Sequence, residues 1–362
     1  MTKARTNASA TPAVGRNMVI NGAMNVAQRA TSVTGLGATA GYFTVDRWKL
    51  DFAATAGRLT MTQTADGPNG ISANCVKLDC TTADASIAAG EYLMFETRFE
   101  GQNLQRIGKG KVGAQQITFS FYVKANAAFT FGIELFDNDN TRQITKLFDT
   151  TADWVRHEIT FPADVDDGSS PFDDDNARSL LATFWLHGGS TFTGGTLNTA
   201  SWANVTNANR AAGIDSFFSN TANNFFLTGV QMEVGPVATE FEQEDISTTL
   251  AKCQRYYQKW LSDTTFDAFA DCGMSSDTRA FWNWRISPTM RAEPTMLAVG
   301  TYEIQIQENN RDVTANPLIN RATPDTIQMF ADIGADNNEA GKIGFIRNKN
   351  DADAYIEFKA EL

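Results

Sequence analysis

Residues 281–285, with the sequence FWNWR, place aromatic, amide and guanidinium groups next to one another. Side chains alternate between the two faces of a strand, so Trp282 and Trp284 would share one face, with Phe281 and Asn283 on the other. Two indole rings on one face suit stacking against the flat faces of sugars. Such a pair is more often part of a hydrophobic core or a subunit interface, and these alternatives stay open.

A second aromatic pair flanks a long polar stretch. Trp185 and Trp202 lie near the ends of residues 188–209, which are rich in Gly, Thr and Asn. This composition is typical of an adaptable loop at the end of a β-sandwich, and such loops commonly bind ligands. Closure of the loop without any binding role is the alternative interpretation.

Acidic residues gather at two places. Residues 164–175 contain six aspartates, and residues 137–140 read DNDN between two expected strands. Oxygen-rich loops suit Ca²⁺, although the spacing does not match an EF-hand. A solvated acidic loop is the favoured explanation for residues 164–175, and a plain hairpin turn is favoured for residues 137–140. The weak candidates for calcium ligands are Asp137, Asp139, Asp173 and Asp175.

Histidine and cysteine form no recognisable catalytic or zinc motif. His157 shares an alternating face with Val155 and Ile159, which predicts a hydrogen-bonded residue at the core edge, and His187 at a strand end is expected to have a loop role. The sequence has no CxxC, HExxH, GxSxG or GxxxxGK[ST], so zinc-site, metalloprotease, serine hydrolase and P-loop readings lack their usual parts. The four scattered cysteines are expected to be free thiols.

The charge balance excludes some partners. Thirty Lys and Arg against 42 Asp and Glu give a net charge of −12. Neither nucleic-acid binding nor an electrostatic anchor on anionic lipid is expected, because both need clustered cations. No apolar run reaches the length of about 18 residues that would predict a membrane span, and the first residues lack the apolar segment of a signal peptide.

The elements that must position these residues are mostly strands. Residues 116–124 alternate apolar and polar side chains, and residues 129–135 and 180–186 repeat the pattern. Residues 17–242 are therefore predicted to form an antiparallel jelly-roll β-sandwich. Apolar residues at helical spacing predict a connector helix over 245–261, within a linker of residues 243–263, with Asp245 or Ser247 as its cap.

The two ends of the chain read differently. Residues 264–362 resume the β pattern and predict a smaller second domain, so the fold class is mainly β. Residues 1–16 are small and polar with three cations, Lys3, Arg5 and Arg16. They are interpreted either as an arm that orders against a partner or as an untethered tail.

Several motifs together resemble bacteriophage virion proteins of the tail-fibre and head-fibre type, which have a carbohydrate-binding-module-like domain. They are residues 17–29 (NMVINGAMNVAQR), 42–48 (YFTVDRW), 226–235 (FLTGVQMEVG), 238–242 (ATEFE), 250–257 (LAKCQRYY), 287–295 (SPTMRAEPT) and 360–362 (AEL).

The resemblance implies a jelly-roll sandwich, a connector helix and a β-rich C-terminal domain. It implies a non-enzymatic homo-oligomer, most often a trimer, that is assembled in the host cytoplasm and becomes part of the virion. The implied partners are other tail or capsid proteins and a host surface glycan. No cofactor is expected apart from a structural Ca²⁺ near the first and last strands of the sandwich. There the family tends to have an acidic residue, whereas this chain has Thr228-Gly229.

The leading hypothesis is a fibre or receptor-binding subunit in which residues 264–362, or the sandwich loops, contact the glycan. The candidate residues are Trp282, Trp284, Arg285, Tyr302, Trp185 and Trp202. The alternative is a capsid-attached head fibre or decoration protein, anchored by residues 1–16. A third reading, a depolymerase that cleaves surface polysaccharide, has no visible acid pair to support it.

Overall fold

The chain divides into two compact units in a computed structural model that describes residues 15–165, 170–334 and 339–362. The first unit comprises residues up to Thr249 together with Leu362, and the second comprises Leu250–Glu361. Within the described ranges, no helix has both the length and the apolar character needed to cross a bilayer.

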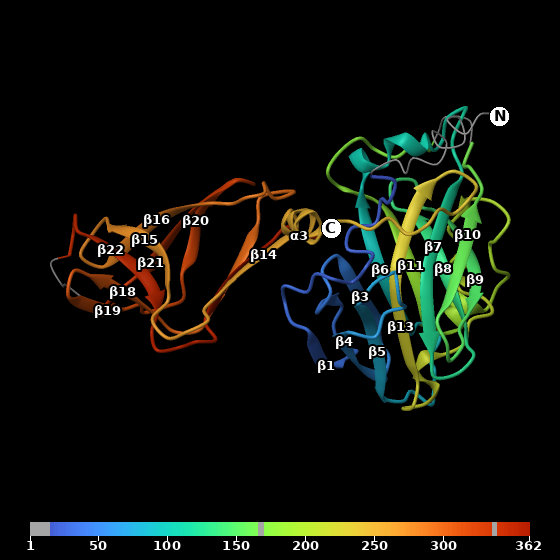
Figure 1. The fold of residues 1–362 in the computed structure, drawn as a ribbon, viewed down its shortest axis with the longest axis horizontal. Coiled ribbons are helices and arrows are strands. Elements are labelled where there is room, and N and C mark those ends of the chain that lie inside the picture. The colour runs from blue at the N-terminus through green and yellow to red at the C-terminus, as the bar shows by residue number, and fades with distance from the viewer. Residues whose placement is uncertain (1–14, 166–169, 335–338) are drawn as a thin grey trace. The chain divides into compact units, whose positions relative to one another are not determined.

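The first unit is a sandwich of two antiparallel sheets (Figure 1, blue to yellow). One sheet has the order β1 (Ser32–Leu36), β4 (Arg58–Thr64), β5 (Cys75–Thr82), β13 (Asn224–Val234), β7 (Ile117–Ala125) and β10 (Val155–Phe161). The other has the order β12 (Ala203–Asn204), β9 (Arg142–Asp149), β8 (Thr130–Asp137), β11 (Arg178–Gly188), β6 (Tyr92–Glu100), β3 (Trp48–Ala53) and β2 (Gly41–Tyr42).

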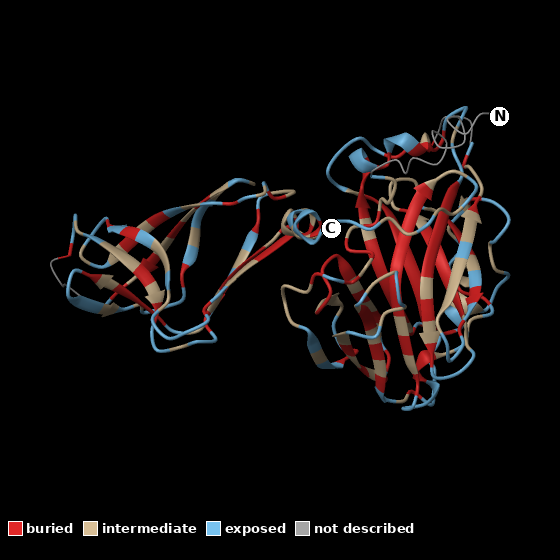
Figure 2. Ribbon diagram, viewed as in Figure 1, coloured by how far each residue is buried: buried red, intermediate tan, exposed pale blue. Residues whose placement is uncertain are grey.

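Alternation along these strands builds the core. Phe119 and Phe121 of β7 lie on the predicted inner face and are fully buried, and Phe121 packs edge-to-face against Phe184 of β11 at 5.1 Å. Figure 2 shows this buried character along the long central strands of both sheets. The predicted fold class, a mainly β chain with a jelly-roll sandwich, is confirmed.

Short helical segments lie in the connections of the first unit. They are η1 (Gly101–Asn103), η2 (Gln105–Ile107), α2 (Ser190–Thr193), η3 (Asn207–Asn209) and η4 (Phe217–Ser219).

The predicted connector helix exists but is shorter than expected. Helix α3 covers Ile246–Gln254, and Asp245 caps it by accepting the backbone N–H of Ser247 at 2.9 Å. Residues 257–261 were predicted to continue the helix and instead form strand β14, which pairs with β23 (Tyr355–Lys359). The ladder supplies their backbone hydrogen bonds, which outweighs the local helical spacing.

The second unit contains two further antiparallel sheets. The smaller has the order β14 (Tyr257–Leu261), β23 and β17 (Thr295–Val299). The larger has the order β19 (Asn309–Asp312), β18 (Tyr302–Ile306), β22 (Ile343–Asn348), β15 (Ala268–Met274), β16 (Arg279–Arg285), β21 (Thr326–Asp332) and β20 (Leu318–Ala322). A separate hydrophobic core that includes Trp282, Ile304 and Phe358 stabilises this unit.

Candidate functional site

The predicted aromatic platform of the second unit is part of its core. Trp282 and Trp284 share one face of β16, as predicted, but Trp282 is only 3% exposed. The ring of Trp284 lies 4.5 Å from that of Trp260 and packs edge-on against Phe358. Trp282 fills the core, and Trp284 is half-buried with its ring packed against that core. The prediction of a stacking surface is therefore wrong for Trp282, and the packing of Trp284 leaves no platform of two open rings.

Tyr302 is also buried. Its hydroxyl donates to the backbone carbonyls of Val299 (2.9 Å) and Tyr355 (2.7 Å), and burial raises the pKa of the phenol. Tyr302 therefore holds strands together rather than facing a ligand. Among the four residues predicted for this domain, Arg285 is the one whose side chain is exposed.

The opposite face of β16 presents the accessible side chains. We call it the open face and define it by Arg279, Phe281, Asn283 and Arg285 on β16, Gln328, Phe330 and Asp332 on β21, Asn320 on β20 and Gly273 on β15. Phe281 and Phe330 are register partners, both half-buried, with ring centroids 5.9 Å apart. Two neighbouring aromatic rings on an outer sheet face thus remain partly exposed to solvent.

A row of side-chain amides runs beside the ring pair. Asn320 Nδ2 donates to Gln328 Oε1 at 2.6 Å, and Gln328 Nε2 donates to Asn283 Oδ1 at 3.4 Å. Asn283 and Asn320 are exposed at the two ends of this row. Each amide has four hydrogen-bonding positions, so the row retains donors and acceptors for a bound molecule.

Gly273 keeps the space beside Phe281 empty. It is the register partner of Phe281 on β15, and a Cβ at this position would meet no atom of the described chain within 4 Å. A side chain here would stand next to the ring in a cross-strand pair. The glycine therefore leaves one side of the ring pair uncovered.

A surface ion pair closes one end of the open face. Arg279 Nη2 donates to Asp332 Oδ2 at 2.7 Å, and the guanidinium carbon lies 4.5 Å from the centre of the Phe330 ring. Hydrogen bonds from Arg279 lower the pKa of the Asp332 carboxyl, so it stays ionised at neutral pH.

The two tryptophans predicted to flank a binding loop in the first unit are buried as well. Trp185 lies fully inside and donates its indole N–H to Glu134 Oε2 at 2.9 Å, and Trp202 donates to the carbonyl of Pro162 at 3.0 Å. The loop between them covers Trp185, with Phe192 packed 5.3 Å from its ring. The prediction that either ring is available for stacking is therefore wrong.

A lysine supplies the cation beside Asp137. Lys109 Nζ lies 2.5 Å from Asp137 Oδ2 and 3.0 Å from Asp164 Oδ2, and all three side chains are buried. Asp137 is thus neutralised within the chain, which corrects its prediction as a calcium ligand. Asp139 accepts the backbone N–H of Asp173, and Asp175 accepts that of Ala177; calcium at these three residues stays a prediction.

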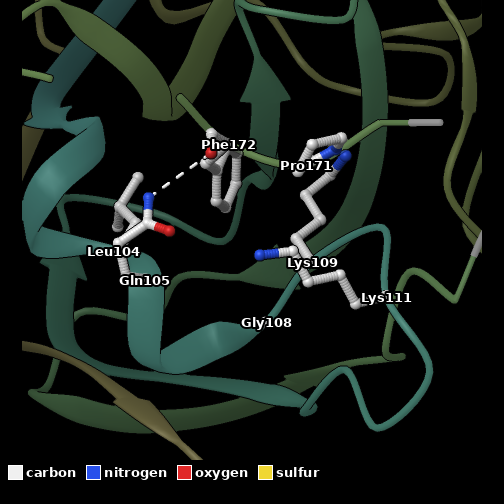
Figure 3. A pocket seen from close by; sticks show the side chains of 7 residues that line it. All are labelled: Leu104, Gln105, Gly108, Lys109, Lys111, Pro171 and Phe172. Atoms are coloured by element: carbon white, nitrogen blue, oxygen red, sulfur yellow. Dashed lines mark hydrogen bonds between the residues drawn. The ribbon is translucent and has the colours of Figure 1, made fainter. Parts of the chain in front are cut away.

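The cavity next to Lys109 is too small for a sugar. Figure 3 shows Leu104, Gln105, Pro171 and Phe172 around it, and its volume is about 10 Å³. This holds one water molecule at most. A broader hollow of about 530 Å³ lies over residues 65–73 and Gln243, but its lining has no aromatic ring and no charged side chain.

The predicted attachment arm is described only at its end. Lys3 and Arg5 lie outside the described residues. Arg16 Nη2 donates to the carbonyl of Glu240 at 3.4 Å, and Glu242 accepts the backbone N–H groups of Gly15 and Asn17. The chain is therefore tied to the sandwich from residue 15 onward.

Sequence reasoning missed the ring pair and a buried polar cluster. The alternation placed Phe281 and Asn283 on one face of the strand, but the binding surface was predicted on the opposite face, which carries the two tryptophans. His187, expected in a loop, lies in β11 and is fully buried beside Asp84 and Glu91. Only strand pairing brings those three residues together, so no local motif could reveal them.

No family model and no curated protein matches the chain. Solved structures do match. A structure titled "CBM4 structure and function" shares 14% identity at a TM-score of 0.30 over 60% of this chain and 99% of its own. A galactotriose complex of the carbohydrate-binding module TmCBM61 shares 8% sequence identity at a TM-score of 0.29, over 61% of this chain and 99% of its own. The enzymatically active domain of bacteriophage CBA120 tailspike protein 4 shares 10% sequence identity at a TM-score of 0.31, over 60% of this chain and 21% of its own.

Proposed function

We propose that this chain is a non-enzymatic structural protein of a phage virion, a fibre or receptor-binding subunit, and that its second unit binds a host surface glycan through the open face. The observation that carries the glycan part is the half-exposed Phe281–Phe330 pair beside the amide row. The motifs described for the sequence support the virion part, including assembly as a homotrimer with other virion proteins.

The groups on the open face match the two sides of a sugar. The C–H face of a pyranose packs on an aromatic ring, while its hydroxyls hydrogen-bond with amides, carboxylates and guanidinium groups. Phe281 and Phe330 supply the rings, and Asn283 and Gln328 supply amides within the same strand pair. The face is a sheet surface rather than a deep pocket, which favours an extended polysaccharide over a small free ligand.

The chemistry of the open face suits binding rather than bond cleavage. Glycoside hydrolysis needs a carboxylic acid that stays protonated near neutral pH, paired with a second carboxylate. The carboxyl of Asp332 has a lowered pKa because of Arg279, so it does not serve as such an acid. Weak binding at each site would be multiplied by the copies in an oligomer and on a particle.

Two measurements test the proposal. The purified full chain should bind at least one polysaccharide on an array of bacterial surface glycans and leave it uncleaved; binding to none would contradict the glycan role. Antibody–gold labelling of intact particles with serum against the second unit should mark the tail or its fibres. Gold spread over the capsid would favour the decoration alternative, and no gold, with a serum proven on the folded protein, would contradict both.

A further inference from the structure

A cluster of three side chains that could bind a metal ion lies in the first unit, apart from the open face. Asp84 follows strand β5, Glu91 precedes β6, and His187 lies near the end of β11. Backbone hydrogen bonds fix this junction: the N–H of Asp84 donates to the carbonyl of Phe218, and the N–H of Gly189 donates to that of Glu91, both at 2.8 Å. One nitrogen or oxygen atom from each of the three side chains lies within 4.8 Å of the others.

The cluster is buried and incompletely satisfied. Asp84 and Glu91 are each 5% exposed, and His187 is 0% exposed. His187 Nε2 and Glu91 Oε2 face each other at 3.6 Å, and neither atom has a hydrogen-bond partner among the described residues. Leaving buried polar atoms unpaired is costly, so two such atoms aimed at one point indicate a missing ligand.

Neighbouring side chains orient the three groups. His187 Nδ1 lies 2.8 Å from Ser216 Oγ; when Nδ1–H donates to this hydroxyl, the lone pair of Nε2 points toward Glu91. Asp84 Oδ2 accepts the hydroxyl of Thr55 at 2.8 Å and the backbone N–H of Ala56 at 2.9 Å. Metal-binding histidines and carboxylates are characteristically held by such outer hydrogen bonds.

We propose that Asp84, Glu91 and His187 bind one divalent transition-metal ion of the Zn²⁺ class, through His187 Nε2, Glu91 Oε2 and a carboxylate oxygen of Asp84, with water as the fourth ligand. An imidazole with two carboxylates suits zinc, whereas Ca²⁺ takes oxygen ligands. Ligands of a tetrahedral Zn²⁺ lie about 3.3 Å apart, close to the observed 3.6 Å between Nε2 and Oε2.

The protonation state of His187 fits this assignment. Burial lowers the pKa of His187, so its imidazole is neutral at pH 7, as a metal ligand must be. Burial and the neighbouring Asp84 raise the pKa of Glu91.

The ion would fasten an exposed connection to the sandwich. Residues 85–90 join Asp84 to Glu91 and are exposed along their length. With both ends of this connection bound to an ion that also holds β11, it would be fixed to the end of the sheet. This role differs from the calcium predicted at the acid-rich loops and does not depend on glycan binding.

The test is a zinc titration of the full chain after removal of metals with EDTA. The wild-type protein is expected to bind one Zn²⁺ per chain with release of heat and a raised melting temperature. His187→Gln and Glu91→Gln are expected to weaken binding at least tenfold. The matched control is His157→Gln, since His157 is the only other histidine and bonds instead to the carbonyl of Asp149; its affinity should equal that of the wild type.

A further variant separates the loss of zinc binding from the loss of the fold. Ser216→Ala keeps all three ligands and removes the hydrogen bond to Nδ1, so it should lower zinc affinity about 10- to 100-fold without unfolding the sandwich. The proposal is overturned if the wild-type chain binds no zinc, if Ca²⁺ binds and zinc does not, or if the His187 and Ser216 variants bind zinc as tightly as the wild type.

Discussion

Replacing Lys109 with methionine should strongly destabilise the first unit. The Lys109 ammonium contacts the carboxylates of Asp137 and Asp164 and donates a hydrogen bond to the carbonyl of Ser170 at 2.9 Å, while its side chain is 1% exposed. Methionine keeps much of the volume but removes the charge. Asp164 retains Arg142 at 3.0 Å, so Asp137 becomes the unpaired buried carboxylate.

The magnitude follows from that single uncompensated charge. Removing one partner of a buried ion pair costs about 3–5 kcal/mol. With a denaturant slope of about 3 kcal/mol/M, the urea midpoint of the first unit should fall by about 1–1.7 M. Circular dichroism of the full chain in urea measures this shift.

Two comparisons make the Lys109 result specific. Lys109→Met combined with Asp137→Asn removes the orphaned charge and should recover most of the lost stability. Lys124→Met breaks a pair with Asp66, whose side chain is 51% exposed, and should cost no more than about 1 kcal/mol. A loss below about 1 kcal/mol for Lys109→Met, or no recovery in the double variant, would refute the reasoning.

The remaining predictions concern the core, the open face and the thiols. Trp282→Ala should lower the free energy of unfolding of the second unit by about 3–5 kcal/mol, measured in urea, because the ring lies in the core. A near-neutral effect would contradict the burial of this ring. Gly273→Leu should leave stability nearly unchanged and abolish glycan binding, measured on the same array, by covering the ring of Phe281. Burial raises three thiol pKa values to about 11, so in native protein at pH 8 these groups stay protonated and should react with a disulfide reagent only after unfolding; rapid native reaction would contradict their burial. The thiols are Cys75, Cys80 and Cys272.

Period-two alternation predicted the strands well because one face of each must be buried. Residues 116–124 show this: Phe119 and Phe121 are buried where the pattern placed them. The predicted helix was too long because the positions of Tyr257 and Leu261 fit a strand as well as a helix. Pairing with β23, about a hundred residues later in the chain, decides in favour of the strand.

The site was harder to predict because it depends on which face is covered. The sequence separates the two faces of β16, but nothing local says that Trp260 and Phe358 cover the tryptophan side. The same limit applies to His187. Its partners come from the β5–β6 connection, so their proximity depends on sheet topology rather than on spacing.

The central claim is that the Phe281–Phe330 pair binds the glycan. The most direct test is the affinity of the full chain for the best polysaccharide of the array, compared with Phe281→Ala/Phe330→Ala and with Phe226→Ala, a half-buried ring on an outer face of the first unit. Loss of two stacking rings, at about 0.5–1.5 kcal/mol each, predicts an affinity roughly 5- to 150-fold lower for the double variant, with the control unchanged. Equal affinity of the folded double variant and the wild type would contradict the account.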